Sequence, residues 1–160
     1  APVGRANLLS YRSLFNAVFS DVYLFRRDIH GIFRESEAAI RKALKRMKIA
    51  LHISADDRVN TKPYSQGQRK RLASAFALAN DKPICLFDEW TADQDPEFRH
   101  YFFHEFLPQM KRAGKTMLVI THDDGQFHLA DKVIRLHAGQ LSDATEAVKA
   151  NAERERSVLA

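Results

Sequence analysis

Residues 83–95 read PICLFDEWTADQD, and this stretch decides the fold class that the sequence predicts. A proline precedes the four apolar residues 84–87. A short unbroken apolar run between turn signals is typical of a strand buried in a parallel sheet. The strand ends in two acids, Asp88 and Glu89. Because binding sites in open α/β sheets form beyond the carboxyl ends of the strands, these acids are candidate site residues.

Downstream of the acids, the sequence predicts a helix over 96–113 and a second buried strand over 116–121. Pro96 suits the first turn of that helix, Pro108 interrupts its late part, and Gly114 suits its C-terminus. The apolar face of the helix would consist of Phe98, Phe102, Phe106 and Met110. His122, Asp123 and Asp124 follow the second strand. They would lie at the same edge of the sheet as the first acid pair.

Upstream of the acids, the sequence predicts a helix that begins after Ser65, a good N-cap, and ends near Asn80. An earlier helix would follow a cap at Ser36, and a strand is predicted near 14–19. The apolar stripe of the earlier helix would be Ile40, Ala43, Leu44, Met47 and Leu51. Alternating strands and helices of this kind indicate an α/β fold with a parallel sheet.

Beyond the second strand, the patterns predict a short helix near 125–130 and a strand near 132–136. A turn is predicted at His137–Gly139, and residues 142–160 form a polar, helical tail. No internal repeat is present.

Residues 64–68 read YSQGQ and stand at the predicted helix start, 20 residues before the acid pair. A helix N-terminus offers free N–H groups and a partial positive charge, so it is a natural phosphate site. Gly67 would let a ligand approach the backbone, and the Ser65 hydroxyl would add a donor. A plain N-cap is the alternative interpretation of this short motif.

Composition excludes several other classes of protein. The chain has 160 residues, 45% of them hydrophobic, which fits one soluble globular domain and excludes disorder. The single cysteine, Cys85, excludes an internal disulfide. Residues 1–72 carry a net charge of +9 and residues 73–160 carry −4. The basic half is compatible with nucleic acid, a membrane surface, phosphates or a solvated face.

Taken in order, these motifs resemble those of the ATPase domain of ATP-binding cassette (ABC) proteins, over about residues 10–141. The matching segments are Tyr64–Gln68 for the signature motif, Ile84–Glu89 for Walker B, Thr91–Asp95 for the D-loop and Thr121–Asp123 for the switch histidine. The resemblance implies a partial P-loop NTPase core with a parallel sheet plus a helical signature subdomain.

The resemblance also implies a division of the chain. Residues 1–27 would end the first core lobe, and residues 28–80 would form the helical subdomain with the signature motif. Residues 81–141 would form the RecA-like core, and residues 142–160 a C-terminal tail.

ATP and Mg²⁺ are the ligands that the resemblance implies. Asp88 would serve Mg²⁺, and Glu89 would polarise the attacking water. His122 would contact the γ-phosphate, and Asp95 would couple two ATP sites across a dimer. The residues that would bind the ATP of the second copy are Ser65, Gln66, Gly67 and Gln68.

Two departures from the family pattern bear on activity. Ser20 stands where most members have the Q-loop glutamine. The chain contains no G-x-x-x-x-G-K-[ST] phosphate loop, since Gly114-Lys115-Thr116 follows a helix and precedes a strand, the reverse of that motif's order. We therefore expect the chain to be the back portion of a cassette that alone binds ATP weakly and does not hydrolyse it.

The residues within these motifs are similar to those of the branch of the family that exports cyclic peptides and siderophores. This implies a membrane domain fused upstream, a second ATPase domain in a homodimer, and a place at the cytoplasmic face of the inner (plasma) membrane. The chain itself would be soluble, and no nucleic acid is expected as a partner. One alternative is the head of a DNA-repair or chromosome-structure ATPase, whose basic half would contact DNA. Another is a non-catalytic module in which residues 28–63 dock a membrane domain.

Overall fold

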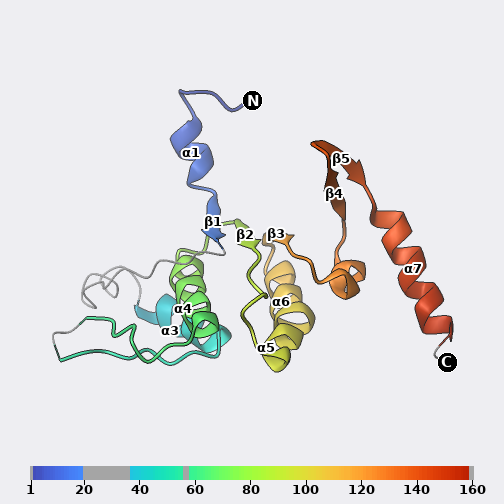
Figure 1. The fold of residues 1–160 in the computed structure, drawn as a ribbon. Helices are drawn as coiled ribbons and strands as arrows, with labels where there is room; N and C mark the ends of the chain where they lie inside the picture. The colour runs from blue at the N-terminus through green and yellow to red at the C-terminus, as the bar shows by residue number, and fades with distance from the viewer. Residues whose placement is uncertain (1, 20–36, 56–57, 159–160) are drawn as a thin grey trace. The chain divides into compact units, whose positions relative to one another are not determined.

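The computed structural model describes residues 2–19, 37–55 and 58–158. The chain divides into two compact units, Ala1–Thr121 and His122–Ala160. A parallel sheet and its helices make up the first unit, whereas the second holds a hairpin and the C-terminal helix (Figure 1).

The sheet of the first unit has the strand order β1-β2-β3, and both pairings are parallel. The strands are β1 (Phe15–Val18), β2 (Ile84–Asp88) and β3 (Thr116–Ile120), close to the predicted ranges. In the register, Phe87 of β2 lies opposite Val18 and Val119. The prediction of an α/β fold with a parallel sheet is therefore confirmed.

One face of this sheet packs on helices and the other is open among the described residues. Cys85 and Phe87 are buried on the packed face, and burial raises the pKa of the Cys85 thiol. The prediction of a second fully buried strand is wrong, because Leu118 is 57% and Ile120 46% exposed. An alternating strand with one covered face buries only every second side chain. An unbroken apolar run does not reveal this difference.

Two helices precede β2, and both follow the predicted patterns. Helix α3 (Glu37–Arg46) buries Ile40, Ala43 and Leu44, and Met47 follows it into the core. Its proposed cap, Ser36, lies outside the described residues. Helix α4 (Gln66–Ala79) begins after Ser65 and ends at Asn80, as predicted. The two helices pack against each other beside the sheet (Figure 1).

The helical segment between β2 and β3 contains an interruption. It consists of α5 (Pro96–Tyr101), a π-helical turn η1 (Phe102–Phe106) and α6 (Leu107–Arg112). Pro108 lacks an N–H group, and its ring crowds the carbonyl four residues earlier. A widened turn just before Pro108 relieves that conflict. Gly114 follows with a φ of +76°, in agreement with the prediction of a glycine at the helix end.

An aromatic cluster joins these helices to the sheet. Phe87 packs edge-on against Phe102, with ring centroids 5.3 Å apart, and Trp90 stacks on Phe102 at 4.5 Å. Phe98 and Phe106 complete the cluster, and all five side chains are buried. The core of the first unit therefore lies directly beneath the carboxyl end of β2.

The second unit contains η2 (Asp124–Leu129), a hairpin of β4 (Ile134–His137) and β5 (Gln140–Asp143), and α7 (Thr145–Val158). The short helix, the strand near 132–136 and the helical tail agree with the prediction. Strand β5 is not among the predicted elements. It forms because Ala138 and Gly139 both adopt positive φ, which joins two antiparallel strands in a tight turn.

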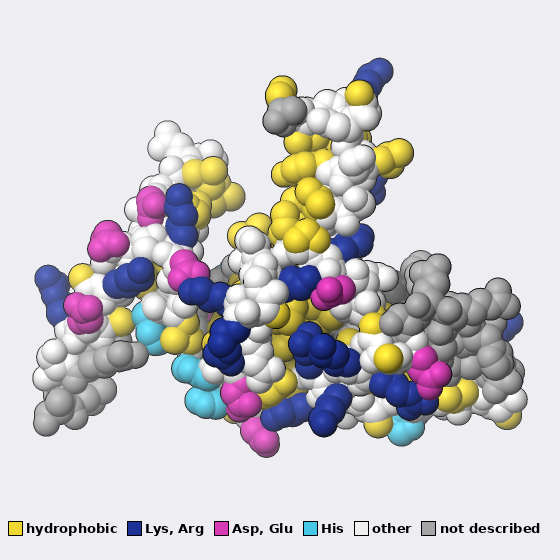
Figure 2. Space-filling model, turned by 180° about the vertical axis from the view of Figure 1, so that it is seen from behind, with side chains coloured by type: hydrophobic (Ala, Val, Ile, Leu, Met, Phe, Trp, Pro, Cys, Tyr) yellow, Lys and Arg dark blue, Asp and Glu magenta, His cyan; other side chains and the backbone are white. Residues whose placement is uncertain are grey.

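A short helix, α1 (Leu8–Arg12), is also absent from the predictions. It buries no side chain, and Leu8, Leu9 and Tyr11 are exposed on it. Figure 2 shows hydrophobic side chains along the segment that carries the N-terminus, whereas Lys and Arg side chains gather lower on the same unit. The basic character of the first half is thus a surface property of the folded unit.

Candidate functional site

The N-terminus of α4 is a closed hydrogen-bonded cap. The Ser65 hydroxyl oxygen accepts from the backbone N–H of Gln68 at 3.2 Å, and the Gln68 amide oxygen accepts from the backbone N–H of Ser65 at 3.0 Å. This reciprocal pair satisfies two of the groups that a helix start leaves open. Within the part of the chain that the structure describes, the N–H groups of Gln66 and Gly67 have no acceptor. They remain available at the positive end of the helix.

Tyr64 holds this cap in place from the preceding segment. Its buried hydroxyl donates to the carbonyl of Ala50 at 2.8 Å and accepts from the N–H of His52 at 2.7 Å. Burial raises the pKa of Tyr64, so the hydroxyl stays a donor at neutral pH. Ser65, next along the chain, is therefore tied to a buried anchor although it is itself exposed.

A tight turn follows β2 and carries the acid pair. Asp88 is the last residue of the strand, and Glu89 has a φ of +47°, in the left-handed region that is costly for a residue with a side chain. The Glu89 N–H donates to the carbonyl of Ile120 in β3 at 2.9 Å. Trp90 is buried next to it, and its indole N–H donates to Ser74 of α4 at 2.7 Å. The core therefore holds the turn on both sides of Glu89.

One stripe of α4 faces this turn. Gly67, Lys70, Arg71 and Ser74 are spaced so that they lie on one side of the helix, and each contacts the residues after β2. A Cβ added at Gly67 would lie 2.3 Å from the carbonyl oxygen of Asp93. Glycine is thus required at this position by the chain's own turn as well as being suited to a ligand's approach.

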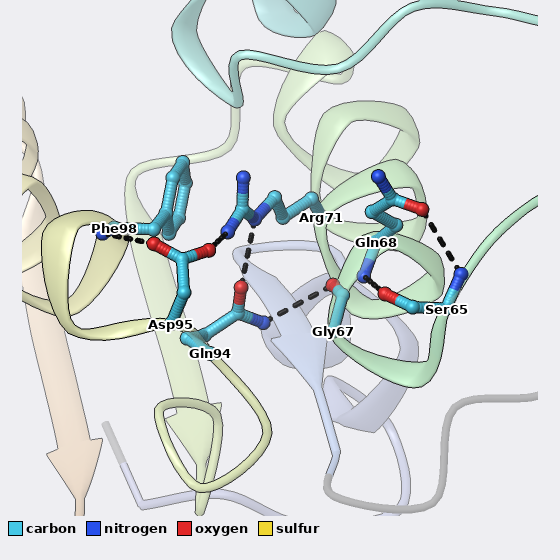
Figure 3. Close-up of polar contacts among 7 residues, drawn as sticks. All are labelled: Ser65, Gly67, Gln68, Arg71, Gln94, Asp95 and Phe98. Atoms are coloured by element: carbon cyan, nitrogen blue, oxygen red, sulfur yellow. Dashed lines mark hydrogen bonds and ion pairs between the residues drawn. The ribbon is translucent and has the colours of Figure 1, made fainter.

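A chain of polar contacts runs from α4 to the start of α5 (Figure 3). The Arg71 guanidinium donates through Nε to the Gln94 side-chain oxygen at 2.7 Å and pairs with the Asp95 carboxylate through Nη2. The Gln94 side-chain nitrogen donates to the carbonyl of Gly67 at 3.1 Å. The N-terminal turns of α4 and the segment before α5 are therefore locked together.

Asp95 uses both of its carboxylate oxygens within the chain. One accepts from the N–H of Phe98 at 2.8 Å and caps α5, and the other accepts from Arg71. The Phe98 N–H and then Arg71 hold the pKa of Asp95 below its ordinary value. Arg71 in turn lies over the Phe98 ring, 3.5 Å from its centroid.

The turn is also linked to the end of β3. The side-chain oxygens of Thr91 and Thr121 lie 3.4 Å apart, and Thr91 is buried. His122 follows directly and opens the second unit, where its carbonyl accepts from the N–H of Asp124 at 2.8 Å. The proximity of His122 to Glu89 stays a prediction.

The structure brings together most of the residues singled out in the sequence. The residues that lie on the first unit, at the start of α4 or in the turn after β2, are Ser65, Gln66, Gly67, Gln68, Asp88, Glu89 and Asp95. His122 lies on the second unit, and Ser20 lies outside the described residues. Over the described ranges, no group of three or more His, Cys, Asp or Glu side chains could hold a metal ion. Any Mg²⁺ here would need oxygen ligands from its substrate as well as Asp88.

Sequence reasoning missed the residues that connect these two parts. Lys70, Arg71 and Gln94 carry most of the contacts between α4 and the turn. The signal that could have found them is the spacing of Gly67, Lys70, Arg71 and Ser74 along one helical stripe. A basic run in a helix is ordinarily interpreted as a solvated face, so this stripe was not predicted to be buried.

Comparison with known proteins identifies the class of this α/β unit. The family described as "ABC transporter" matches residues 3–92, which is more than half of the chain. The chain therefore belongs to the ABC transporter family. It is 45% identical over 133 residues to the "ATP-binding protein SyrD" of Pseudomonas syringae pv. syringae. It is 35% identical over 101 residues to the "Histidine/lysine/arginine/ornithine transport ATP-binding protein HisP" of Salmonella typhimurium.

A solved structure supports the fold. The chain superposes on cbiO1 from Clostridium perfringens, described as part of the ABC transporter complex cbiONQ, with a TM-score of 0.73 and 24% identity. The match covers 97% of this chain and 66% of that one. The fold is thus that of an ABC ATPase.

The chain spans less than half the length of these two curated relatives. The match to SyrD covers 81% of this chain and 24% of SyrD. The match to HisP covers 61% of this chain and 39% of HisP. Among the described residues, no helix combines the length and the apolar character needed to cross a membrane.

Proposed function

We propose that the chain supplies the signature helix and the hydrolytic turn of the ATPase of an ABC transporter. The observation that carries this proposal is the locking of the α4 N-terminus to the Asp88–Glu89 turn within one compact unit. An anion-binding helix start and a pair of acids behind a parallel strand are two of the parts that ATP hydrolysis uses, and the phosphate loop is a third that this sequence does not contain.

The start of α4 binds phosphate oxygens of ATP. The N–H groups of Gln66 and Gly67, for which no acceptor is found among the described residues, would donate to these oxygens, while Ser65 and Gln68 flank them. In the family arrangement this ATP belongs to a second copy, so the site is completed by a homodimer.

The turn after β2 performs the hydrolytic chemistry. Glu89 accepts a proton from, or polarises, the attacking water. Asp88 would hold Mg²⁺ together with the phosphates, and the chemistry that the ion would supply is neutralisation of the charge that develops on the phosphate oxygens. His122 contacts the γ-phosphate, and Ser20 stands in the Q-loop in place of glutamine.

Asp95 couples the two sites through the chain itself. Its carboxylate is bound to Arg71 of α4 and to the N-terminus of α5. If α4 moves towards a phosphate, the segment that follows the acid pair therefore moves with it.

The proposed partners and cargo come from the resemblance of the motifs. Their residues are similar to those of exporters of cyclic peptides and siderophores, so we propose export of a peptide or siderophore-like cargo at the cytoplasmic face of the inner membrane. A membrane domain, fused upstream, would select the cargo. The relatives named as transport or transporter proteins favour this function over a DNA-repair or chromosome-structure ATPase.

Steady-state ATP hydrolysis by the full-length protein tests the proposal. We expect Glu89→Gln to lower kcat by at least about a hundredfold, because it removes the proton acceptor, while ATP binding persists. Glu97→Gln, a matched change at an exposed acid in the first turn of α5, should leave kcat unchanged. Equal rates for wild type and Glu89→Gln would reject the assignment, as would turnover by the 160-residue chain alone.

A further inference from the structure

Lys70 is a buried lysine on the α4 stripe. Its side chain is only 3% exposed. An ammonium group that is taken out of water is strongly destabilising unless it is paired and hydrogen-bonded. Its position inside the unit therefore depends on the groups that it contacts.

The Lys70 ammonium has two oxygen partners in the turn. It lies 2.6 Å from the Asp93 carboxylate and donates to the backbone carbonyl of Glu89 at 3.2 Å. The Asp93 carboxylate is 38% exposed, so the charge of the pair reaches solvent on the Asp93 side. Lys70 thus joins the beginning and the end of the turn to α4.

The contact with Glu89 fixes a backbone that is otherwise unfavourable. Glu89 has a φ of +47°, a conformation that is costly for a residue with a Cβ. Its N–H is bound to the carbonyl of Ile120 and its carbonyl is bound to Lys70. With both peptide groups held, the direction in which the Glu89 side chain leaves the backbone is fixed by β3 on one side and α4 on the other.

We propose that Lys70 is a positioning residue that aims the Glu89 carboxylate from the signature helix of the same chain. The inference rests on the proposed function of Glu89. Lys70 lies one turn after the N–H groups of Gln66 and Gly67 on α4. In this proposal, a phosphate bound at that helix start acts on Glu89 through the Lys70 ammonium. Among the contacts described above between α4 and the turn, the Lys70 contact is the one made to the Glu89 backbone itself.

The chain provides a chemically matched control in Lys115. Its ammonium donates to the carbonyl of Asp81 at 2.7 Å and lies 3.0 Å from the Asp81 carboxylate. Asp81 also has a positive φ, of +49°. This second contact stands before β2 and β3, at the end of the sheet opposite to Glu89. Its loss would report on stability without a direct effect on the site.

The test measures kcat and KM for ATP with the full-length protein. We expect Lys70→Met to lower kcat by about tenfold or more with KM within about twofold, because an orienting contact is lost while ATP binding remains. Lys70→Gln keeps an N–H donor for the Glu89 carbonyl and should retain more kcat than Lys70→Met. Lys115→Met should match wild type. Equal losses in Lys70→Met and Lys115→Met would overturn the proposal, as would a change in KM alone.

A second measurement keeps this inference separate from the proposed function. Trp90 is the only tryptophan of the chain, and it directly follows Glu89. In the 160-residue chain, Lys70→Met should raise acrylamide quenching of Trp90 by about twofold or more, because buried Trp90 gains solvent access when the turn is released. Lys115→Met should leave quenching unchanged. Absence of ATP hydrolysis by the wild-type full-length protein rejects the proposed function. Unchanged quenching in both Lys70→Met and Lys70→Gln rejects the positioning role.

Discussion

The two ends of the central sheet carry the same contact in different surroundings. At the carboxyl end, Lys70 binds the carbonyl of Glu89 and the carboxylate of Asp93. At the amino end, Lys115 binds the carbonyl and the carboxylate of Asp81. Both contacts stand beside a residue with positive φ. The Lys115 side chain is 14% exposed and that of Asp81 is 85% exposed, so water reaches the second pair from its acidic partner.

The two contacts therefore differ in role. The Lys115 contact stabilises a turn, whereas the Lys70 contact also positions a residue of the candidate site. A solvated ion pair contributes between 0 and about 1 kcal/mol, whereas breaking a buried pair leaves a charge without compensation and costs about 3–5 kcal/mol. Lys70 is buried but Asp93 is 38% exposed, so this pair falls at the lower end of the second range. The more buried pair lies beside Glu89, the proposed hydrolytic residue, and the solvated pair lies where no candidate residue is found.

The largest effect is expected from removing the carboxylate beside the buried ammonium. Asp93→Ala should lower the free energy of unfolding by about 3 kcal/mol, because Lys70 loses its counter-ion inside the unit. Asp81→Ala, the equivalent change at the solvated end, should cost at most about 1 kcal/mol. Urea denaturation followed by circular dichroism measures both. Equal costs at the two ends would contradict the comparison.

The next comparison is between two glycines, Gly67 at the carboxyl end of the sheet and Gly114 at its amino end, and the cost of replacing each by alanine. Gly67→Ala should cost about 2 kcal/mol, because its Cβ would meet the Asp93 carbonyl and the turn must shift. Gly114→Ala has open space around it and only a positive φ to oppose it, so a cost of about 1 kcal/mol is expected. The same denaturation experiment compares them. A neutral Gly67→Ala would mean that α4 and the turn are not in close contact.

The planar geometry of Arg71 gives a smaller effect. The planar guanidinium of Arg71 binds Gln94 and Asp95 through two different nitrogens and stacks on the Phe98 ring. The single ammonium group of a lysine cannot make these three contacts together. Arg71→Lys should therefore lower the free energy of unfolding by about 1.5 kcal/mol. Arg112→Lys, at an exposed position in the last turn of α6, is the control and should be neutral. A neutral Arg71→Lys would show that charge alone holds the segment before α5.

The smallest effect is a pH dependence from Asp95. Its pKa is lowered in the folded chain, first by the Phe98 N–H and then by Arg71, so the ionised form is favoured by folding. The stabilisation is complete above the unfolded pKa, about 3.9, and is lost as the pH falls through the lower folded pKa. In Asp95→Asn, Tm should decrease less steeply than in the wild type as the pH falls below about 4. Parallel Tm curves for the two proteins would rule out this contribution.

Elements with local signals were predictable from the sequence. Ser65 begins α4 because its side chain caps the helix, and the apolar run 84–87 forms β2 because it is short and bounded by turn signals. The four residues Ser65 to Gln68 and the pair Asp88–Glu89 could likewise be chosen as candidate site residues from motif order alone.

The connections between those elements could not be predicted. Lys70 and Asp93 are far apart in the chain. Helical spacing places Lys70 on the stripe of Gly67 and Ser74 and leaves Arg69 off it, but this spacing does not reveal which residue Lys70 contacts. The exposed face of β3 depends on what packs over it, which an apolar run does not encode. Strand β5 has few strand-forming residues and owes its pairing to the turn before it.

Hydrogen exchange at the start of α4 tests the central claim most directly. The full-length Glu89→Gln protein, which retains ATP, is compared with and without ATP and Mg²⁺. We expect the amides of Gln66 and Gly67 to exchange about tenfold more slowly with nucleotide, because phosphate oxygens accept from them. The amide of Gly125, in the second unit, should not change. Bound ATP with unchanged exchange at Gln66 and Gly67 would contradict the assignment of this helix start as a phosphate site.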